Sequence, residues 1–166
     1  MAALRRVDPA SAPSRMTRVM SRVGITRPAR FISRHFGWKL DPVLLRLTGN
    51  RIATTVVIPT AVVETRGART GRSRRNAVIY FHDGDRAIIA ASNAGAAQHP
   101  DWYYNVVADP HVTFSGVPMR AQLIEDVADR ERLWSLADRV FPGFAVYRRD
   151  AEAAGRTIPL IALRPS

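Results

Sequence analysis

The chain has 166 residues, enough for one domain with a hydrophobic core of its own. It contains no cysteine, which excludes disulfide bonds, thiolate metal sites and cysteine nucleophiles. No apolar run reaches the roughly 18 residues of a membrane-spanning helix, and the first residues lack the apolar stretch of a secretory signal, so a cytoplasmic protein is expected.

Positive charge is concentrated in the first half of the chain. Residues 1–75 hold sixteen basic and three acidic residues, whereas residues 76–166 hold nine basic and eleven acidic ones. The net charges are therefore +13 and −2, and Lys39 is the only lysine among the bases. Codon usage in a GC-rich genome would explain the preference for arginine. The asymmetry indicates an anionic partner for the first half: nucleic acid, membrane lipid or a polyanionic cofactor.

The first 50 residues are predicted to form a basic tail followed by short amphipathic helices. Residues 1–14 are rich in Pro, Ala and Ser, and are expected to be mobile. Residues 15–23 carry an apolar stripe at helical spacing with arginines outside it, and further short helices are expected near 28–38 and 42–47. These helices either cover the rest of the protein or lie on an anionic bilayer, with residues 15–38 in peripheral contact.

The sequence pattern of residues 51–166 predicts an α+β domain. Asp83-Gly84 between two apolar runs predicts a hairpin, and Pro100 followed by Asp101 predicts the start of a helix. The expected strands are 54–65, 76–81, 86–92, 111–115, 119–125 and 157–163. The expected helices are 101–108 and 126–140, with an irregular or helical segment at 144–154. Hairpins with interspersed helices favour an antiparallel barrel over a parallel sheet.

An arginine-rich segment joins the first two expected strands. Residues 67–76 (GARTGRSRRN) hold two glycines, which allow a tight turn, and four arginines. Guanidinium groups bind phosphate bidentately, so the segment predicts an anion site. It is not a P-loop, because the Gly-Lys-Ser/Thr ending is absent. Considered alone, it is also consistent with a solvated basic hairpin.

Three further segments are candidates for a site. Residues 90–97 (AASNAGAA) leave room for a flat ligand on the backbone, or allow close packing against a helix. Residues 99–105 (HPDWYYN) offer stacking surfaces and hydrogen-bonding groups, or form a buried core helix. The aromatic residues between Phe144 and Tyr147 follow a Pro-Gly break, where they would roof a pocket or fill the core.

Several other kinds of site find no support in the sequence. The four histidines show no metal-ligand spacing, so no metal site is expected. A Gly-x-Ser-x-Gly motif is absent, which argues against a serine hydrolase. The arginines of the basic half are not interleaved with a clear aromatic platform, and the aromatic cluster lies in the acidic half, so no nucleic-acid partner is expected.

Taken in order, these segments closely resemble the deazaflavin-dependent nitroreductase family, which includes quinone reductases. The resemblance rests on residues 62–76, 83–84, 90–96, 99–105 and 108–110, with 156–159 (RTIP) similar to the family's last strand. It spans about residues 61–163 and implies a split β-barrel with flanking helices, like that of flavin-mononucleotide (FMN) oxidases. The implied cofactor is coenzyme F420 (8-hydroxy-5-deazaflavin), whose phosphate and polyglutamate tail are anionic; FMN is the alternative.

The resemblance also implies the site residues. The implied cofactor-binding residues are Arg69, Thr70, Gly71, Arg74, Asn76, Ala91, Ser92, Asn93, Ala94, Gly95 and Ala96. Trp102, Phe144 and Tyr147 would line the substrate side. We expect Tyr147 or Ser92 to be catalytic, as the donor of a hydrogen bond when charge develops on the acceptor. The chain departs from the family at Ala68, where an arginine is usual, at Asn93, which replaces a basic residue, and near Phe144 and Asp150, where relatives carry tyrosines.

The implied reaction is hydride transfer from the reduced coenzyme to a quinone, a nitro compound or another activated small-molecule acceptor. Two alternatives stay open. One is a non-catalytic ligand- or lipid-binding protein on the same barrel, docked to the membrane by its N-terminal helices. The other is an FMN-dependent oxidoreductase.

Overall fold

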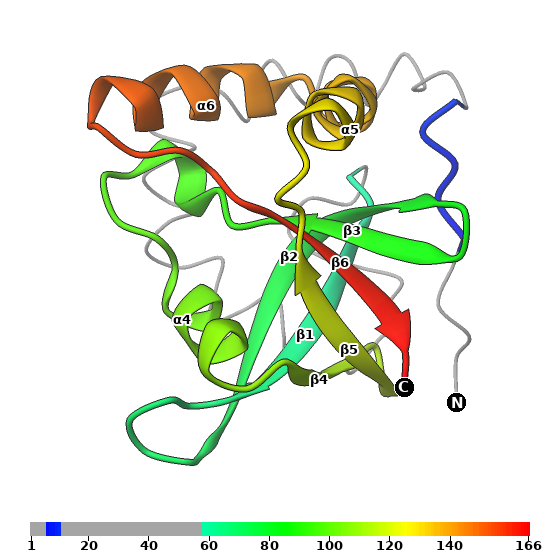
Figure 1. Cartoon of the computed structure of the whole chain (residues 1–166), viewed down its shortest axis with the longest axis vertical. Coiled ribbons are helices and arrows are strands. Elements are labelled where there is room, and N and C mark those ends of the chain that lie inside the picture. The colour runs from blue at the N-terminus through cyan, green and yellow to red at the C-terminus, as the bar shows by residue number, and fades with distance from the viewer. Residues whose placement is uncertain (1–5, 11–57) are drawn as a thin grey trace.

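A closed antiparallel barrel forms the centre of the protein (Figure 1). The computed structural model describes residues 6–10 and 58–166, and within them six strands close in the order β1-β2-β3-β6-β5-β4. The strands are β1 Thr60–Arg66, β2 Ser73–Asp83, β3 Arg86–Ala90, β4 His111–Phe114, β5 Val117–Leu123 and β6 Leu160–Pro165. The predicted α+β split barrel is thereby confirmed.

The predicted helices between residues 15 and 47, and the start of the first predicted strand, lie outside the described residues. The division into a tail of residues 1–50 and a barrel domain of residues 51–166 therefore stays a prediction. In the part of the chain that is described, no helix is both long and apolar enough to span a membrane.

Alternation along the strands gives the barrel wall two apolar faces. In β3, Ala87 and Ile89 belong to the inner core, which also contains Val63 and Phe114. Ile88, between them, belongs to an outer core on the other side of the wall. Because both faces are covered, β3 is buried at its three central residues and β6 from Leu160 to Leu163, whereas Arg164 and Pro165 are exposed.

Helices cover both cores. Helix α4 (Asp101–Ala108) has the predicted bounds and packs Trp102 and Val106 into the inner core. Helices α5 (Val127–Val140) and α6 (Gly143–Ala153) cover the outer core. Helix α5 begins one residue later than predicted because Asp126 is its N-cap, accepting a hydrogen bond from the Asp129 amide at 2.7 Å. A short 3-10 turn, η2 (Asn93–Gly95), packs against α6.

Tight turns set the register of two hairpins. The predicted Asp-Gly hairpin is confirmed, with Asp83 opposite Arg86 and Gly84 at φ +60° in the two-residue loop. Between β4 and β5, Ser115 and Gly116 both have positive φ, at 50° and 84°, as a type I′ turn requires.

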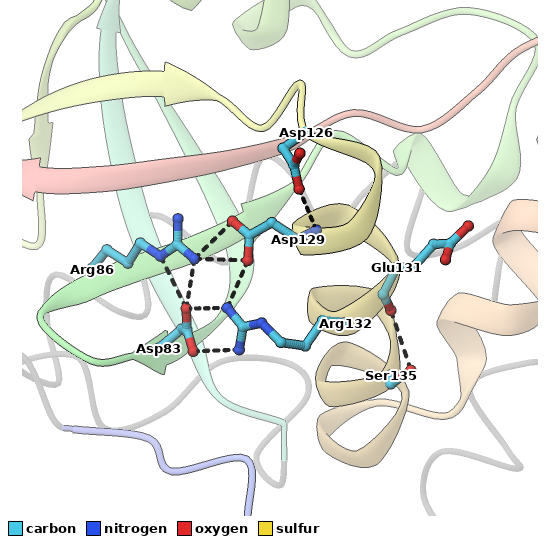
Figure 2. Close-up of polar contacts among 7 residues, drawn as sticks. All are labelled: Asp83, Arg86, Asp126, Asp129, Glu131, Arg132 and Ser135. Carbon is cyan, nitrogen blue, oxygen red and sulfur yellow. Dashed lines mark hydrogen bonds and ion pairs between the residues drawn. The ribbon is translucent and has the colours of Figure 1, made fainter.

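A charge network fastens α5 to the β2–β3 hairpin (Figure 2). Asp83 accepts hydrogen bonds from Arg86 at 2.7 Å and from Arg132 at 2.8 Å. Asp129 accepts hydrogen bonds from Arg86 at 2.8 Å and from Arg132 at 2.7 Å. Two carboxylates and two guanidinium groups thus alternate, so each charge faces two of opposite sign.

Candidate functional site

The loop between β1 and β2 is a compact turn. The Gly67 amide donates to the Arg72 carbonyl at 2.8 Å, and the Gly71 amide donates to the Gly67 carbonyl at 2.7 Å. Gly71 has φ +66°, and a Cβ on Gly67 would lie 2.8 Å from the Thr70 hydroxyl. Both glycines are therefore needed for the turn, as the sequence predicts.

A buried asparagine anchors this loop to α4. The Asn105 side-chain oxygen accepts from the Ala68 amide at 2.9 Å, and its amide nitrogen donates to the Thr65 hydroxyl at 3.0 Å. Both Asn105 and Thr65 are buried. Asn105 belongs to the aromatic segment singled out in the sequence but is absent from the predicted site residues. A lone polar residue on the apolar face of a helix is the signal that would have found it.

Three arginines of this loop are available to an anion. Arg69, Arg72 and Arg74 are exposed, and none of them forms an ion pair with another described residue. Arg75 differs, since its guanidinium binds Glu64 at 2.7 Å. The loop thus keeps a local excess of positive charge, and its donors suit a phosphate group.

The strand register places two more predicted residues on the α4 side of the sheet. Arg74 lies directly opposite Thr65, so the two share a face. Thr65 is held by α4 through Asn105, and Asn76, two residues beyond Arg74, lies on that same face. The structure therefore brings Arg69, Arg74 and Asn76 to one end of the barrel, beside α4 (Figure 1).

The small-residue segment follows β3 and has an unusual backbone. Asn93, Ala94 and Gly95 have φ values of 46°, 50° and 78°, all in the left-handed region. A Cβ on Gly95 would lie 2.9 Å from the Tyr147 carbonyl oxygen, so η2 packs directly on α6. Of the two interpretations of this segment, close packing against a helix is correct for Gly95. Ser92 and Asn93 are partly exposed.

Arg156 reaches this segment from the chain that leads into β6. Its guanidinium donates to the carbonyls of Ala96 at 2.7 Å, Ser92 at 2.7 Å and Ala91 at 3.1 Å. Arg156 is only 7% exposed, and burial lowers the pKa of its guanidinium. Arg156 begins the 156–159 segment noted in the sequence but is absent from the predicted site residues, because nothing local distinguishes the role of one arginine in a chain with so many.

His99 is the fourth group beside this guanidinium. Its Nδ1 lies 3.2 Å from Arg156 Nη1, which can only donate, so His99 Nδ1 accepts and carries no proton. Burial and then the positive charge of Arg156 lower the pKa of His99. The rings of Tyr103 and Tyr104 pack around the imidazole, with centroids 4.5 and 6.0 Å away, and Tyr104 is 51% exposed.

The predicted substrate-side residues are buried. Trp102 is in the inner core, whereas Phe144 and Tyr147 are in the outer core, where both rings pack against Phe141. The structure therefore brings Tyr147 to the Ser92–Ala96 segment through Gly95, and assigns Trp102 to a separate cluster. Their roles toward substrate stay predictions.

Two surface grooves lie away from the predicted site residues. A polar groove of about 380 Å³ is lined by Asp83, Asp85, Arg86, Arg164 and Pro165. Another, of about 310 Å³, runs between α4 and β5 and includes Val107 and Leu123. Neither contains the arginine loop or the Ser92–Ala96 segment. Within residues 6–10 and 58–166, no group of three or more acidic, histidine or cysteine residues is placed to hold a metal ion.

Comparison with known proteins identifies relatives over most of the chain. A family model described as F420H(2)-dependent quinone reductase matches residues 41–165. The F420H(2)-dependent quinone reductase Rv1261c of Mycobacterium tuberculosis is 28% identical over 145 residues, which cover 81% of this chain and 96% of the relative. A solved F420-H2 dependent reductase (FDR-A) has a TM-score of 0.56 at 28% identity, covering 64% of this chain and 94% of that one. A solved domain-swapped dimer has a TM-score of 0.57 at 26% identity, covering 75% and 96%.

Proposed function

Since the chain belongs to the F420H(2)-dependent quinone reductase family and is thereby an F420H2-dependent oxidoreductase, we propose that it reduces a quinone by hydride transfer. The resemblance read from the sequence is confirmed by that family match. Nitro compounds and other activated small molecules are further acceptors of the same chemical class. The observation that carries the proposal is the arginine loop, where Arg69, Arg72 and Arg74 have no carboxylate partner among the described residues and suit an anionic coenzyme.

In this proposal, the coenzyme phosphate is held by Arg69 and Arg74, with Asn76 on the same face of β2. The turn at Thr70 and Gly71 sets the position of Arg69. The hydrogen bond from the Ala68 amide to Asn105 of α4 fixes the loop relative to the barrel, so the backbone that carries the arginines is held in place before the coenzyme arrives. The donors present fit a phosphate, since each guanidinium is a planar fork of N–H groups.

The flavin-type ring is assigned to the segment from Ala91 to Ala96. When bound, the reduced coenzyme supplies the hydride, and the protein contributes orientation and electrostatics. Ser92 is partly exposed at the start of η2, and Tyr147 lies where α6 meets Gly95. Either hydroxyl would donate a hydrogen bond to the acceptor as negative charge develops on it.

A fluorescence titration with oxidised coenzyme, run alongside FMN, tests the proposal. We expect saturable binding of the deazaflavin and weaker binding of FMN. Arg69→Ala should weaken deazaflavin binding about tenfold, the scale of one charge-assisted hydrogen bond. Arg75→Ala is the matched control: it removes the same charge from the same segment, but Arg75 is already paired with Glu64.

Equal losses in the two variants would show that only overall charge matters and would remove Arg69 from the phosphate site. Absence of deazaflavin binding to the wild-type protein would contradict the reductase proposal itself. If binding is found, oxidation of the reduced coenzyme with added quinones and nitro compounds then ranks the acceptors.

A further inference from the structure

The segment after β3 adopts a conformation that its sequence does not favour. Asn93, Ala94 and Gly95 are consecutive left-handed residues, and Ala94 has φ 50° and ψ 31°. Ordinary L-residues avoid this region because the Cβ approaches the following carbonyl oxygen. Asn93 has a local compensation, since its side chain donates to the Gln98 carbonyl at 2.9 Å. Ala94 has no polar side chain, so the conformation must be imposed from outside the segment.

Arg156 is placed to impose it. Its Nε binds the carbonyl of Ala96, and its two terminal nitrogens bind the carbonyls of Ser92 and Ala91. The guanidinium is a rigid planar fork, so it fixes these three carbonyls relative to one another. The chain between Ser92 and Ala96 must therefore fold back within a short span, which is what the left-handed turn does.

The arrangement is costly for stability alone. Arg156 is 7% exposed and forms no ion pair among the described residues; its partners are carbonyls and a neutral imidazole. A buried cation without a counter-ion loses more hydration than such partners easily restore. A chain that needed only packing at this position would be better served by an apolar side chain. The cost indicates that the fixed carbonyl geometry serves binding.

The amides of Ser92 and Asn93 lie on the side of the segment that faces away from Arg156. Every peptide bond among the described residues is trans, so each amide N–H points opposite to the carbonyl that precedes it. The carbonyls of Ala91 and Ser92 point at Arg156, so the amides of Ser92 and Asn93 point away from it. Neither amide has a hydrogen-bond partner within the described part of the chain.

We propose that Arg156 is a positioning residue, which turns these carbonyls inward and presents the amides of Ser92 and Asn93 as a pair of donors to the coenzyme. The inference rests on the proposed function, which assigns this segment to the flavin-type ring. Carbonyl oxygens of such a ring are acceptors that two adjacent N–H groups can bind. The positive charge behind the segment further polarises both peptide groups toward donation.

Arg156→Met tests the role, because it removes the donors at similar side-chain length. In the free protein, hydrogen exchange of the Gly95 and Ala96 amides, which donate to the Ser92 and Asn93 carbonyls, should become at least about tenfold faster. The dissociation constant of the oxidised coenzyme should rise by about tenfold or more, since only a fraction of molecules then holds the competent conformation. At saturating coenzyme, kcat should fall much less, because binding restores that conformation.

Two further variants separate positioning from general stability. Arg148→Met is the matched control: Arg148 binds Asp138 at 2.7 Å and stacks on Trp134, but does not touch the segment. It should leave both the exchange of the Gly95 and Ala96 amides and the dissociation constant unchanged. Arg156→Lys keeps the charge without the planar fork, so it should give intermediate values.

A folded Arg156→Met protein with unchanged exchange and unchanged coenzyme affinity would overturn the proposal. If that variant does not fold, two other measurements decide: Arg156→Lys, and the Nε–H signal of Arg156 in the wild-type protein, which the 2.7 Å bond to Ala96 predicts to exchange slowly. Rapid exchange of that proton, or wild-type affinity in Arg156→Lys, would contradict the role. A wild-type protein that binds no coenzyme refutes the proposed function, and the exchange data on the free protein still decide whether Arg156 fixes the segment.

Discussion

Replacing Asp83 by asparagine should remove the central acceptor of the charge network that joins the β2–β3 hairpin to α5 (Figure 2). The side chain keeps its shape but loses the charge that both Arg86 and Arg132 bind. Among the described residues, Asp129 would remain as the only carboxylate for the two guanidinium groups. We expect a lower free energy of unfolding at neutral pH, with α5 less firmly attached.

The size of the loss follows from the pKa of Asp83. Hydrogen bonds from Arg132 and then Arg86, against an opposing effect of burial, lower this pKa from 3.8 to about 2. That interval corresponds to about 2 kcal/mol in favour of the folded state above pH 4. Asp83 is only 19% exposed, but Arg132 is 50% exposed, so solvent screening brings the expected loss to about 1–2 kcal/mol.

The sign of the pH dependence is fixed by the same pKa. A lowered carboxylate pKa gives stability that is fully present above the unfolded-state value of about 4. The contribution is then lost as the pH falls through the folded-state value of about 2. The difference between wild type and Asp83→Asn should therefore be constant from pH 7 to pH 5 and shrink between pH 4 and pH 2.

Urea unfolding followed by circular dichroism over this pH range measures the effect. Asp85→Asn is the control: it lies in the same hairpin turn, is exposed, and forms no ion pair with any described residue. It should change the free energy of unfolding by less than about 0.5 kcal/mol. Equal losses in the two variants at pH 7, or an Asp83→Asn loss that persists undiminished at pH 2, would refute the assignment of this stability to the network.

Two substitutions test the parts of the site. Asn105→Leu keeps the side-chain volume but leaves the Ala68 amide and the Thr65 hydroxyl without their partner. The free energy of unfolding, followed by thermal melting, should fall by about 2–3 kcal/mol, and the coenzyme should bind more weakly. An unchanged melting temperature would contradict the anchor role. Gly95→Ala combines a φ of +78° with a Cβ 2.9 Å from the Tyr147 carbonyl, whereas Gly84→Ala has a similar φ and open space. Gly95→Ala should therefore destabilise by at least about 1 kcal/mol more than Gly84→Ala, and equal melting temperatures would show that the close contact with α6 is unimportant.

Local signals explain why much of the fold is predictable. Asp83-Gly84 identifies a hairpin because few other residues accept the positive φ of its turn. Helix α4 has its predicted bounds because Pro100 and Asp101 at its start are read directly from the sequence. Strand β2 begins at Ser73, earlier than predicted. Its first residues are polar, and only their pairing with β1 identifies them as strand.

The supports of the site have weaker local signals, because their partners lie far away in the sequence. Asn105 acts on partners 37 and 40 positions away in the chain, and Arg156 on partners 57–65 positions away, so their roles exist only after the barrel has closed. The left-handed conformation of Ala94 is equally hidden, because alanine is among the residues least suggestive of it. The sequence identifies the segments that carry the site but leaves out the side chains that hold them in place.

Charge is used differently at the two ends of the barrel, and the difference bears on the origin of the arginine excess. At the β2–β3 hairpin, each guanidinium of the network faces carboxylates. At the β1–β2 loop, Arg69, Arg72 and Arg74 have no carboxylate partner among the described residues. Codon usage would explain arginine in place of lysine, but it does not determine which arginines go unpaired. Like charges that have no counter-ion repel one another and lower stability, whereas a bound anion would offset that repulsion. The concentration of three such arginines on one anchored loop therefore favours an anion-binding role for the loop.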